Sequence, residues 1–284
     1  MSLPQPLLPI LIEPLVRAAL LEDLGRAGDI TTDAIVPADA RMRGVIAARK
    51  PGVVAGSSAA MLAFSLLDAG VEVTVEKPDG SPVQRGDVVL RMSGPARAIL
   101  AAERVALNFM CQLSGIATAT AALVAAARPH RASIVCTRKT TPGLRILEKH
   151  AIRAGGGGNH RFGLDDAVLI KDNHVAVAGG VRPAIERVKR AVGHLVKVEV
   201  EVDSLAQLEE ALATGADAVL LDNMTLEQMA EAVKRVNGRM LTEASGGITL
   251  ETVGPIAATG VDLISSGWLT HSAPALDLGL DYAD

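Results

Sequence analysis

The chain has 284 residues, of which 49% are hydrophobic and 21% are charged. This composition excludes a disordered protein, and the length suits one large or two modest domains with a sizeable core. There are 28 Lys and Arg residues against 32 Asp and Glu residues, which gives a net charge of −4. This balance and an aromatic content of 2% argue against a general nucleic-acid binder, which needs a basic face and stacking side chains.

The cysteines and the apolar segments indicate in which cellular compartment the protein is expected. Cys111 and Cys136 have no metal or redox spacing, so we expect a cytoplasmic protein without a disulfide framework. The N-terminal segment lacks a basic region and is interrupted by Glu13 and Arg17, which is not typical of a signal peptide. The longest uncharged stretch, 105–127, contains polar residues and much alanine, which predicts a buried helix and no membrane span.

The first third of the chain has the pattern of a small α/β module. Residues 10–24 are helical in pattern, and apolar and polar residues alternate over 71–76, as in a half-exposed strand. Further strands are predicted at 45–46 and 88–90. A helix is predicted to start near Pro95, because proline suits the first turn of a helix.

The rest of the chain has a different sequence pattern, in which short apolar runs recur. From about residue 196 they return roughly every 22 residues, with capping boxes at Ser204 and Thr225 starting the helices between them. Such a series of βα units predicts a parallel sheet and favours a (β/α) barrel, with a doubly wound sheet as the alternative. The predicted strands are 134–136, 167–170, 198–202, 218–221, 240–241 and 261–264.

Polar residues follow these strands repeatedly, at the position where barrels place their functional groups. Over 197–202 the valines share one face of the strand, while Glu199 and Glu201 share the other, which would point into the barrel. The alternative is an edge strand with a solvated face, and it is less favoured because the flanking strands have the pattern of strands buried on both sides. Asp222 ends the next strand, so Glu201 and Asp222 predict a site for a hard cation such as Mg²⁺.

Basic residues concentrate between Arg138 and Arg161, in an otherwise acidic chain. This cluster predicts an anionic substrate, although a solvated helix face is the alternative. The run Gly155–Gly158 lacks the features of a Walker motif, whereas the loops 245–247 and 266–267 follow strands and suit phosphate. No zinc spacing or nucleophile elbow is visible. His130, His150 and His194 have no evident partner in the sequence, and we expect them to be structural or solvated.

The segments that carry a family resemblance are GDITT at 28–32, AERVALNFMCQLSGIAT at 102–118, CTRKTTPGLRILEKHAIRAGGGGNHRFGL at 136–164, LIKDNH at 169–174, VEVEV at 198–202, LLDN at 220–223, EASGGI at 243–248 and GWLTHS at 267–272. Taken together, they resemble the quinolinate phosphoribosyltransferase family, and the most specific of them is the long motif at 136–164. The resemblance implies an N-terminal α/β sandwich (1–111), an open, irregular (β/α) barrel with parallel strands (112–268) and a tail (269–284) that returns to the first domain. It also implies a homodimer with a shared active site.

The resemblance further implies a pentosyltransferase that joins quinolinate to 5-phosphoribosyl 1-diphosphate and releases CO₂. Lys139, Glu201 and Asp222 take the catalytic positions of the family, and the last two also hold Mg²⁺. Arg104 matches an arginine contributed by the partner subunit. The remaining substrate-binding positions are Thr137, Arg138, His160, Arg161 and Lys171 around quinolinate, and Ser245, Gly246, Gly247, Ser266, Gly267 and His271 around the 5-phosphate. At position 268 the family has a small residue, whereas this chain has a tryptophan.

Three alternatives remain at this point. A related family associated with molybdenum transport shares the fold and several motifs. A Schiff-base aldolase would use Lys139, Lys171 or Lys197. A catalytically silent anion-binding protein would bind phosphate without turnover.

Overall fold

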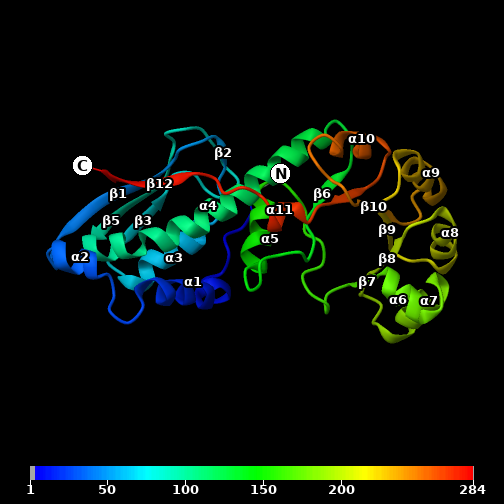
Figure 1. The fold of residues 1–284 in the computed structure, drawn as a ribbon, viewed down its shortest axis with the longest axis horizontal. Coiled ribbons are helices and arrows are strands. Elements are labelled where there is room, and N and C mark those ends of the chain that lie inside the picture. Colours follow the sequence, from blue (N-terminus) through cyan, green and yellow to red (C-terminus); the bar gives the residue numbers. More distant parts are fainter. Residues whose placement is uncertain (1–3, 284) are drawn as a thin grey trace. The chain divides into compact units, whose positions relative to one another are not determined.

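A computed structural model of the chain describes residues 4–283 (Figure 1). Two compact units divide this part of the chain, and each is assembled from segments that are distant in the sequence. Unit 1 comprises the described residues up to Ala121, the segment Thr140–Gly156 and the described residues from Leu269. Unit 2 comprises Ala122–Lys139 and Gly157–Trp268. The segment Thr140–Gly156, which the domain prediction includes in 112–268, therefore clusters with unit 1.

Unit 1 contains a four-stranded antiparallel sheet in the order β12-β1-β5-β3, and a second, two-stranded sheet that pairs β2 with β4. Strand β12 comes from the end of the chain, and its pairing with β1 completes the sheet that the first residues begin. The strands are β1 (Arg41–Ala48), β2 (Gly52–Val53), β3 (Glu72–Val75), β4 (Pro82–Val83), β5 (Val88–Pro95) and β12 (Leu278–Ala283).

Helices form the second layer of unit 1, in which α1 packs on α3 and α3 packs on β3. The strands and helices predicted for the first third of the chain are confirmed, and their layers form the predicted α/β sandwich. The helices are α1 (Pro9–Leu24), α2 (Ile30–Ile35), α3 (Ser57–Leu67), α4 (Ala96–Ala127), whose last turns from Ala122 belong to unit 2, and α5 (Arg145–Ala154).

Helix α4 begins directly after Pro95, as predicted, and runs for 32 residues. Its length and composition alone would allow it to cross a membrane, but 50% of its most apolar window is buried inside the protein. Ser114 and Thr120 in the same helix are fully buried, and their hydroxyl groups donate to the backbone oxygens of Ala55 and Ile116. These features are those of a core helix, in agreement with the prediction of a buried helix.

A buried polar cluster joins three elements of unit 1. The Asp79 carboxylate accepts hydrogen bonds from the backbone N–H groups of Gly56 and Ser57, at the start of α3, both at 3.1 Å. It also lies 2.7 Å from His150 Nε2 in α5. His150 therefore has a structural role, which was one of the two expected for it, and its partner lies 71 positions away in the sequence. Burial opposes the charge of Asp79, but the hydrogen bonds from His150 and Ser57 outweigh it and lower the pKa of the carboxyl group.

Unit 2 contains a six-stranded sheet in the order β6-β11-β10-β9-β8-β7, and every neighbouring pair is parallel. The helices α7, α8, α9 and α10 lie on the outer side of this curved sheet (Figure 1). The strands are β6 (Ser133–Val135), β7 (Val168–Ile170), β8 (Val198–Val202), β9 (Ala218–Asp222), β10 (Leu241–Ser245) and β11 (Leu263–Ser265). The helices are α6 (Asp172–Ala178), α7 (Val181–Ala191), α8 (Leu205–Thr214), α9 (Leu226–Val236) and α10 (Val253–Ala258). The short helix α11 (Trp268–His271) starts with the last residue of unit 2 and continues into the last segment of unit 1.

The strand order distinguishes the two sheet architectures that the sequence allowed. Strands β7 to β11 follow one another around the sheet in chain order, whereas a doubly wound sheet reverses direction at a switch point. Strand β6 then pairs with β11, as in a barrel, but among residues 4–283 it forms no pair with β7. The sheet is therefore the predicted open (β/α) barrel.

Strand β8 has neighbours on both sides, so the alternative of an edge strand is excluded. Its valines and Glu199 are buried, as expected for two covered faces. The prediction that the flanking strands are also buried on both sides holds for β9 only. In β7, Val168 and Leu169 are partly exposed because this strand forms an open edge of the sheet.

The loops after the strands lead into capped helices. Thr225 forms the predicted capping box with Gln228 and starts α9. Ser204 accepts a hydrogen bond from the Gln207 N–H group and starts α8, but Gln207 Oε1 accepts from the Asp203 N–H group and not from Ser204. The second predicted capping box is therefore only half formed, and the helix still starts where expected.

Candidate active site

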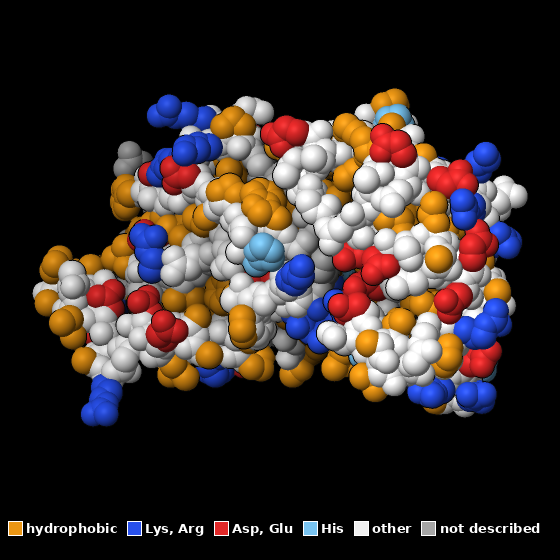
Figure 2. All heavy atoms as spheres, turned by 45° about the vertical axis from the view of Figure 1, so that its right-hand side comes forward, with side chains coloured by type: hydrophobic (Ala, Val, Ile, Leu, Met, Phe, Trp, Pro, Cys, Tyr) orange, Lys and Arg blue, Asp and Glu red, His pale blue; other side chains and the backbone are white. Residues whose placement is uncertain are grey.

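The carboxyl ends of the parallel strands in unit 2 meet at one edge of the sheet, and predicted site residues lie at each of them. On the displayed face of the molecule, acidic side chains gather in one patch with basic side chains beside it (Figure 2). Thr137, Arg138 and Lys139 follow β6, Lys171 follows β7, Glu201 lies in β8, Asp222 ends β9, Ser245 ends β10, and Ser266 and Gly267 follow β11.

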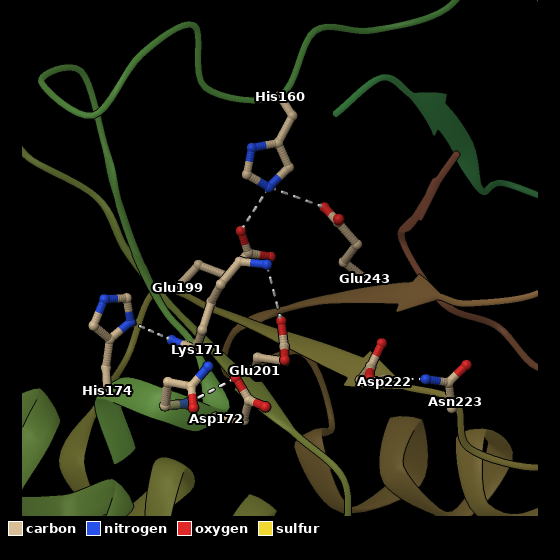
Figure 3. Close-up of polar contacts among 10 residues, drawn as sticks. His160, Lys171, Asp172, His174, Glu199, Glu201, Asp222, Asn223 and Glu243 are labelled. Atoms are coloured by element: carbon tan, nitrogen blue, oxygen red, sulfur yellow. Dashed lines mark hydrogen bonds and ion pairs between the residues drawn. The ribbon is translucent and has the colours of Figure 1, made fainter. Parts of the chain in front are cut away.

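Glu201 and Asp222 come from neighbouring strands, with Lys171 beside them (Figure 3). Lys171 Nζ lies 3.8 Å from Glu201 Oε2. Burial raises the pKa of Glu201, and the charges of Asp222 and Asp172 raise it further, while Lys171 lowers it. Asn223 Nδ2 donates to Asp222 Oδ2 at 2.9 Å and so orients that carboxylate. Two neighbouring carboxylates, of which Asp222 raises the pKa of Glu201, are a donor set that suits Mg²⁺.

Two of the predicted arginines, Arg138 and Arg161, are close enough to interact electrostatically. Burial lowers the pKa of Arg161, the charge of Arg138 lowers it further, and Asp166 and Glu199 act in the opposite direction. Arg161 Nη1 also donates to the backbone oxygen of Ala167 at 3.1 Å. Two half-buried guanidinium groups held near one another repel, so an anion with several oxygens would stabilise them together.

Lys139 packs against the loop after β11. Its backbone N–H group donates to Thr137 Oγ1 at 3.0 Å. A Cβ atom at Gly267 would lie 2.8 Å from Lys139 Cδ, closer than such atoms approach, and 3.2 Å from Thr137 Oγ1, which is a tight contact. The next residue back, Ser266, is buried and donates its N–H group to Val135 at 3.1 Å. A side chain at position 267 would therefore displace Lys139 from its place against this loop.

The loop after β10 is tied to the end of β9. Asn223 donates its N–H group to the backbone oxygen of Ser245 at 3.1 Å. Gly246 and Gly247 have φ angles of 99° and 61°, and a Cβ atom at Gly246 would overlap the Asn223 side chain. Only glycine combines this backbone conformation with that close approach.

The other predicted substrate residues, Arg104 and His271, belong to unit 1, and both are exposed. His271 Nδ1 lies 2.6 Å from Ser272 Oγ. Trp268, the residue that departs from the family pattern, begins α11 and is 44% exposed.

A cluster of His160, Glu199 and Glu243 was not predicted. His160 Nε2 lies 2.9 Å from Glu199 Oε2 and 3.8 Å from Glu243 Oε2 (Figure 3). The ligand atoms of the three residues all lie within 4.8 Å of one another. Burial, and then the charge of Glu199, raises the pKa of Glu243 to about 7, while His160 acts in the opposite direction.

The sequence contained a partial signal for this cluster. The alternation over 198–202 places Glu199 on the same face as Glu201, so its inward direction was predicted. For Glu243 the sequence showed only a position near the end of a predicted strand, and no local spacing connects it to His160. The strand order brings them together, with β9 lying between β8 and β10.

Two family models match the chain and together cover most of it. The model described as "Quinolinate phosphoribosyl transferase, N-terminal domain" matches residues 29–114. The model described as "Quinolinate phosphoribosyl transferase, C-terminal domain" matches residues 116–281.

Curated proteins and solved structures agree with these matches. The probable nicotinate-nucleotide pyrophosphorylase [carboxylating] of Bacillus subtilis is 44% identical over 270 residues, covering 95% of this chain and 93% of its own. The corresponding protein of Mycobacterium leprae is 47% identical, with 94% and 95% covered. The crystal structure of NadC from Streptococcus pyogenes superposes with a TM-score of 0.94 at 44% identity, and covers 99% of this chain and 100% of its own.

Proposed function

Because the chain belongs to the quinolinate phosphoribosyl transferase family, we propose that it transfers the phosphoribosyl group of 5-phosphoribosyl 1-diphosphate to quinolinate. The products are nicotinate mononucleotide, diphosphate and CO₂, as in NAD biosynthesis. One observation carries the proposal: a single edge of one sheet gathers the cations that a dicarboxylate and a polyphosphate require, next to two carboxylates suited to Mg²⁺.

Quinolinate has two carboxylates, and we assign them to the basic side of this edge. Arg138, Arg161 and Lys171 supply the charge, with Thr137 and His160 at the same site. The mutual repulsion of the two arginines supports this assignment, because a bound dianion would relieve it. The requirement for both carboxylates distinguishes quinolinate from nicotinate.

The ribose and diphosphate of the second substrate lie, in this proposal, between β8, β9 and the two glycine loops. Glu201 and Asp222 would hold the ribose hydroxyl groups and Mg²⁺, which when bound supplies positive charge for the diphosphate. Lys139 lies against the loop after β11 and would contact the same diphosphate. The 5-phosphate would be held by Ser245, Gly246, Gly247, Ser266, Gly267 and His271.

The chemistry requires positioning and charge rather than a nucleophile from the protein. The bond between the anomeric carbon and the diphosphate oxygen breaks, and Lys139 stabilises the leaving group. The carboxylates of Glu201 and Asp222 favour the positive charge that develops on the ribose ring. The pyridine nitrogen bonds to the anomeric carbon. The adjacent carboxylate then leaves as CO₂, and the electron pair that remains on the ring carbon, stabilised by the quaternised nitrogen, takes a proton from water.

We also propose a cytoplasmic homodimer in which Arg104 of one subunit completes the site of the other. Six large apolar side chains on or next to the first two helices are exposed, and a second copy would cover such side chains. They are Leu8, Ile10, Leu11, Leu21, Ile30 and Ile35.

The reaction is tested by chromatography of the products formed from quinolinate, 5-phosphoribosyl 1-diphosphate and Mg²⁺, with nicotinate as a parallel substrate. We expect nicotinate mononucleotide from quinolinate and none from nicotinate. Removal of the metal with EDTA should stop turnover, and added Mg²⁺ should restore it. Turnover of nicotinate, or none of quinolinate by folded protein, would contradict the assignment.

Mixed dimers test the shared site. Arg104→Ala and Lys139→Ala should each be inactive alone, whereas their mixture after subunit exchange should recover about a quarter of the normal activity. This follows because half of the dimers are mixed and each mixed dimer has one intact site. A mixture of Lys139→Ala with Glu201→Gln, which damage the same side of the site, is the control and should recover nothing. Equal recovery in both mixtures, or none in either when exchange is complete, would contradict the shared site.

A further inference from the structure

Glu199 is a buried carboxylate in β8 that the proposed mechanism does not use. Its side chain is 11% exposed, and the residues opposite it on the neighbouring strands are Leu169 and Ala218, neither of which has a polar side chain. Burial of a carboxylate is costly unless a hydrogen-bonding partner compensates for it. The partner here is His160, whose Nε2 atom lies 2.9 Å from Glu199 Oε2.

The hydrogen bonds of His160 define the tautomer of its ring. The Arg161 N–H group donates to His160 Nδ1 at 2.8 Å, so Nδ1 carries no proton. The neutral ring therefore carries its proton on Nε2, and Glu199 Oε2 accepts this proton (Figure 3). Glu243 Oε2 lies 3.8 Å from the same nitrogen, beyond hydrogen-bond distance, so Glu199 is the acceptor of the two glutamates.

This arrangement differs from that of a metal site. A metal-binding histidine donates a proton through the nitrogen that does not bind the metal, whereas Nδ1 of His160 accepts one. The pair of His160 and Glu199 is therefore a hydrogen-bonded pair, in which the ring bridges a carboxylate on β8 and the backbone of Arg161.

Arg161 connects the pair to the proposed quinolinate site. Its backbone N–H group is held by His160, and its guanidinium group donates to the backbone oxygen of Ala167 at 3.1 Å. The charge of Arg138 repels this guanidinium group, whereas the charge of Glu199 attracts it. Glu199 thus acts on Arg161 both through the His160 ring and through its own charge.

We propose that Glu199 is a positioning residue for quinolinate binding, which accepts the Nε2 proton of His160 so that Nδ1 can hold the backbone of Arg161. Without this acceptor the ring can carry its proton on Nδ1, where it would face the Arg161 N–H group, and two donors cannot bond to each other. The inference rests on the proposed function, because that function assigns a quinolinate carboxylate to Arg161. Glu199 acts through His160 and does not itself contact the substrate.

The test compares Glu199→Ala with Glu199→Gln in the full-length protein. Loss of the acceptor should raise the KM for quinolinate by about tenfold, the effect of one hydrogen bond to a charged group, and leave the KM for 5-phosphoribosyl 1-diphosphate within about twofold. The amide oxygen of Gln can accept the Nε2 proton, so Glu199→Gln should keep the KM for quinolinate within about threefold of normal. An unchanged KM for quinolinate in folded Glu199→Ala would overturn the proposal, and so would equal damage by Gln and Ala.

Val200→Ala is the matched control. Val200 is the next residue of the same strand and is fully buried, but its side chain lies on the opposite face of the sheet from Glu199. The smaller side chain should lower the melting temperature and leave both KM values within about twofold of normal. If Val200→Ala raises the KM for quinolinate as much as Glu199→Ala does, the effect is one of general destabilisation and the proposal fails.

A measurement on the unmodified protein covers the case in which Glu199→Ala does not fold. The ¹⁵N chemical shifts of the His160 ring should report a neutral imidazole protonated at Nε2. A ring protonated at Nδ1, whether neutral or charged, would overturn the inference whatever the kinetics. This outcome is distinct from a failure of the proposed function, which would appear as absence of quinolinate turnover by unmodified protein.

Discussion

Replacement of Lys139 by alanine is expected to lower kcat by about 10²–10³-fold, with little change in the KM for quinolinate. Loss of a charged group that stabilises a leaving group has an effect of this size in other enzymes. Steady-state kinetics with each substrate varied in turn measures both constants. A smaller residue at 139 leaves the backbone hydrogen bond to Thr137 in place, so the protein should remain folded.

Lys197→Ala is the matched control for this variant. Lys197 is also a lysine of unit 2, but its side chain is 80% exposed and Nζ lies 2.6 Å from Asp217 Oδ1, at the amino end of β8. Loss of such an exposed ion pair should leave kcat within about twofold of normal. Gly267→Ala should act in the same direction as Lys139→Ala, because the added methyl group displaces Lys139. Full activity of Lys139→Ala would remove this lysine from the reaction.

Replacement of Asp79 by alanine is expected to lower the free energy of unfolding by about 3–5 kcal/mol, the usual cost of breaking a buried pair by removing one partner. The backbone N–H groups of Gly56 and Ser57 lose their acceptor at the start of α3, and His150 loses its partner. Urea unfolding followed by circular dichroism measures the change. Asp87→Ala is the control: its carboxylate accepts from the Gln84 N–H group in an exposed turn, and its loss should cost less than about 1 kcal/mol.

The contribution of Asp79 should depend on pH in a defined direction. The pKa of this carboxyl group is lowered in the folded protein, so the unfolded chain binds its proton at a higher pH than the folded protein does. The stabilisation is therefore complete above the ordinary value of 3.8 and is lost as the pH falls through the lowered value. The difference in stability between the natural protein and Asp79→Asn should be constant near neutral pH and shrink in acid. A difference that grows in acid would contradict the assignment.

The sequence could predict strands, helices and most of the strand-end residues because these depend on local periodicity. The valine and glutamate alternation over 198–202 is such a pattern, and β8 has the bounds that it predicted. The same pattern gave the direction of Glu199 and Glu201, because side chains alternate along any strand.

Pairings between distant residues could not be predicted in this way. Asp79 meets His150 only because α5 belongs to unit 1, although it lies in the middle of the chain. Glu199 and Glu243 lie on either side of β9, where the residue opposite Glu199 is the small Ala218. On the other side of β9, Glu243 lies opposite Leu220, and His160 contacts both glutamates from a loop far away in the sequence, so no local pattern could show the cluster.

The open barrel retains two sheet edges, which a closed barrel would lack. Exposed edges present unpaired backbone groups to other chains and are templates for aggregation. Here the two edge strands, β6 and β7, are each only three residues long. On the β6 side, Gly158 forms a bridge to Val135 and occupies part of the edge. Each edge therefore offers few backbone groups with which a strand of another chain could pair. The barrel can remain open next to the predicted substrate-binding residues without promoting aggregation at its edges.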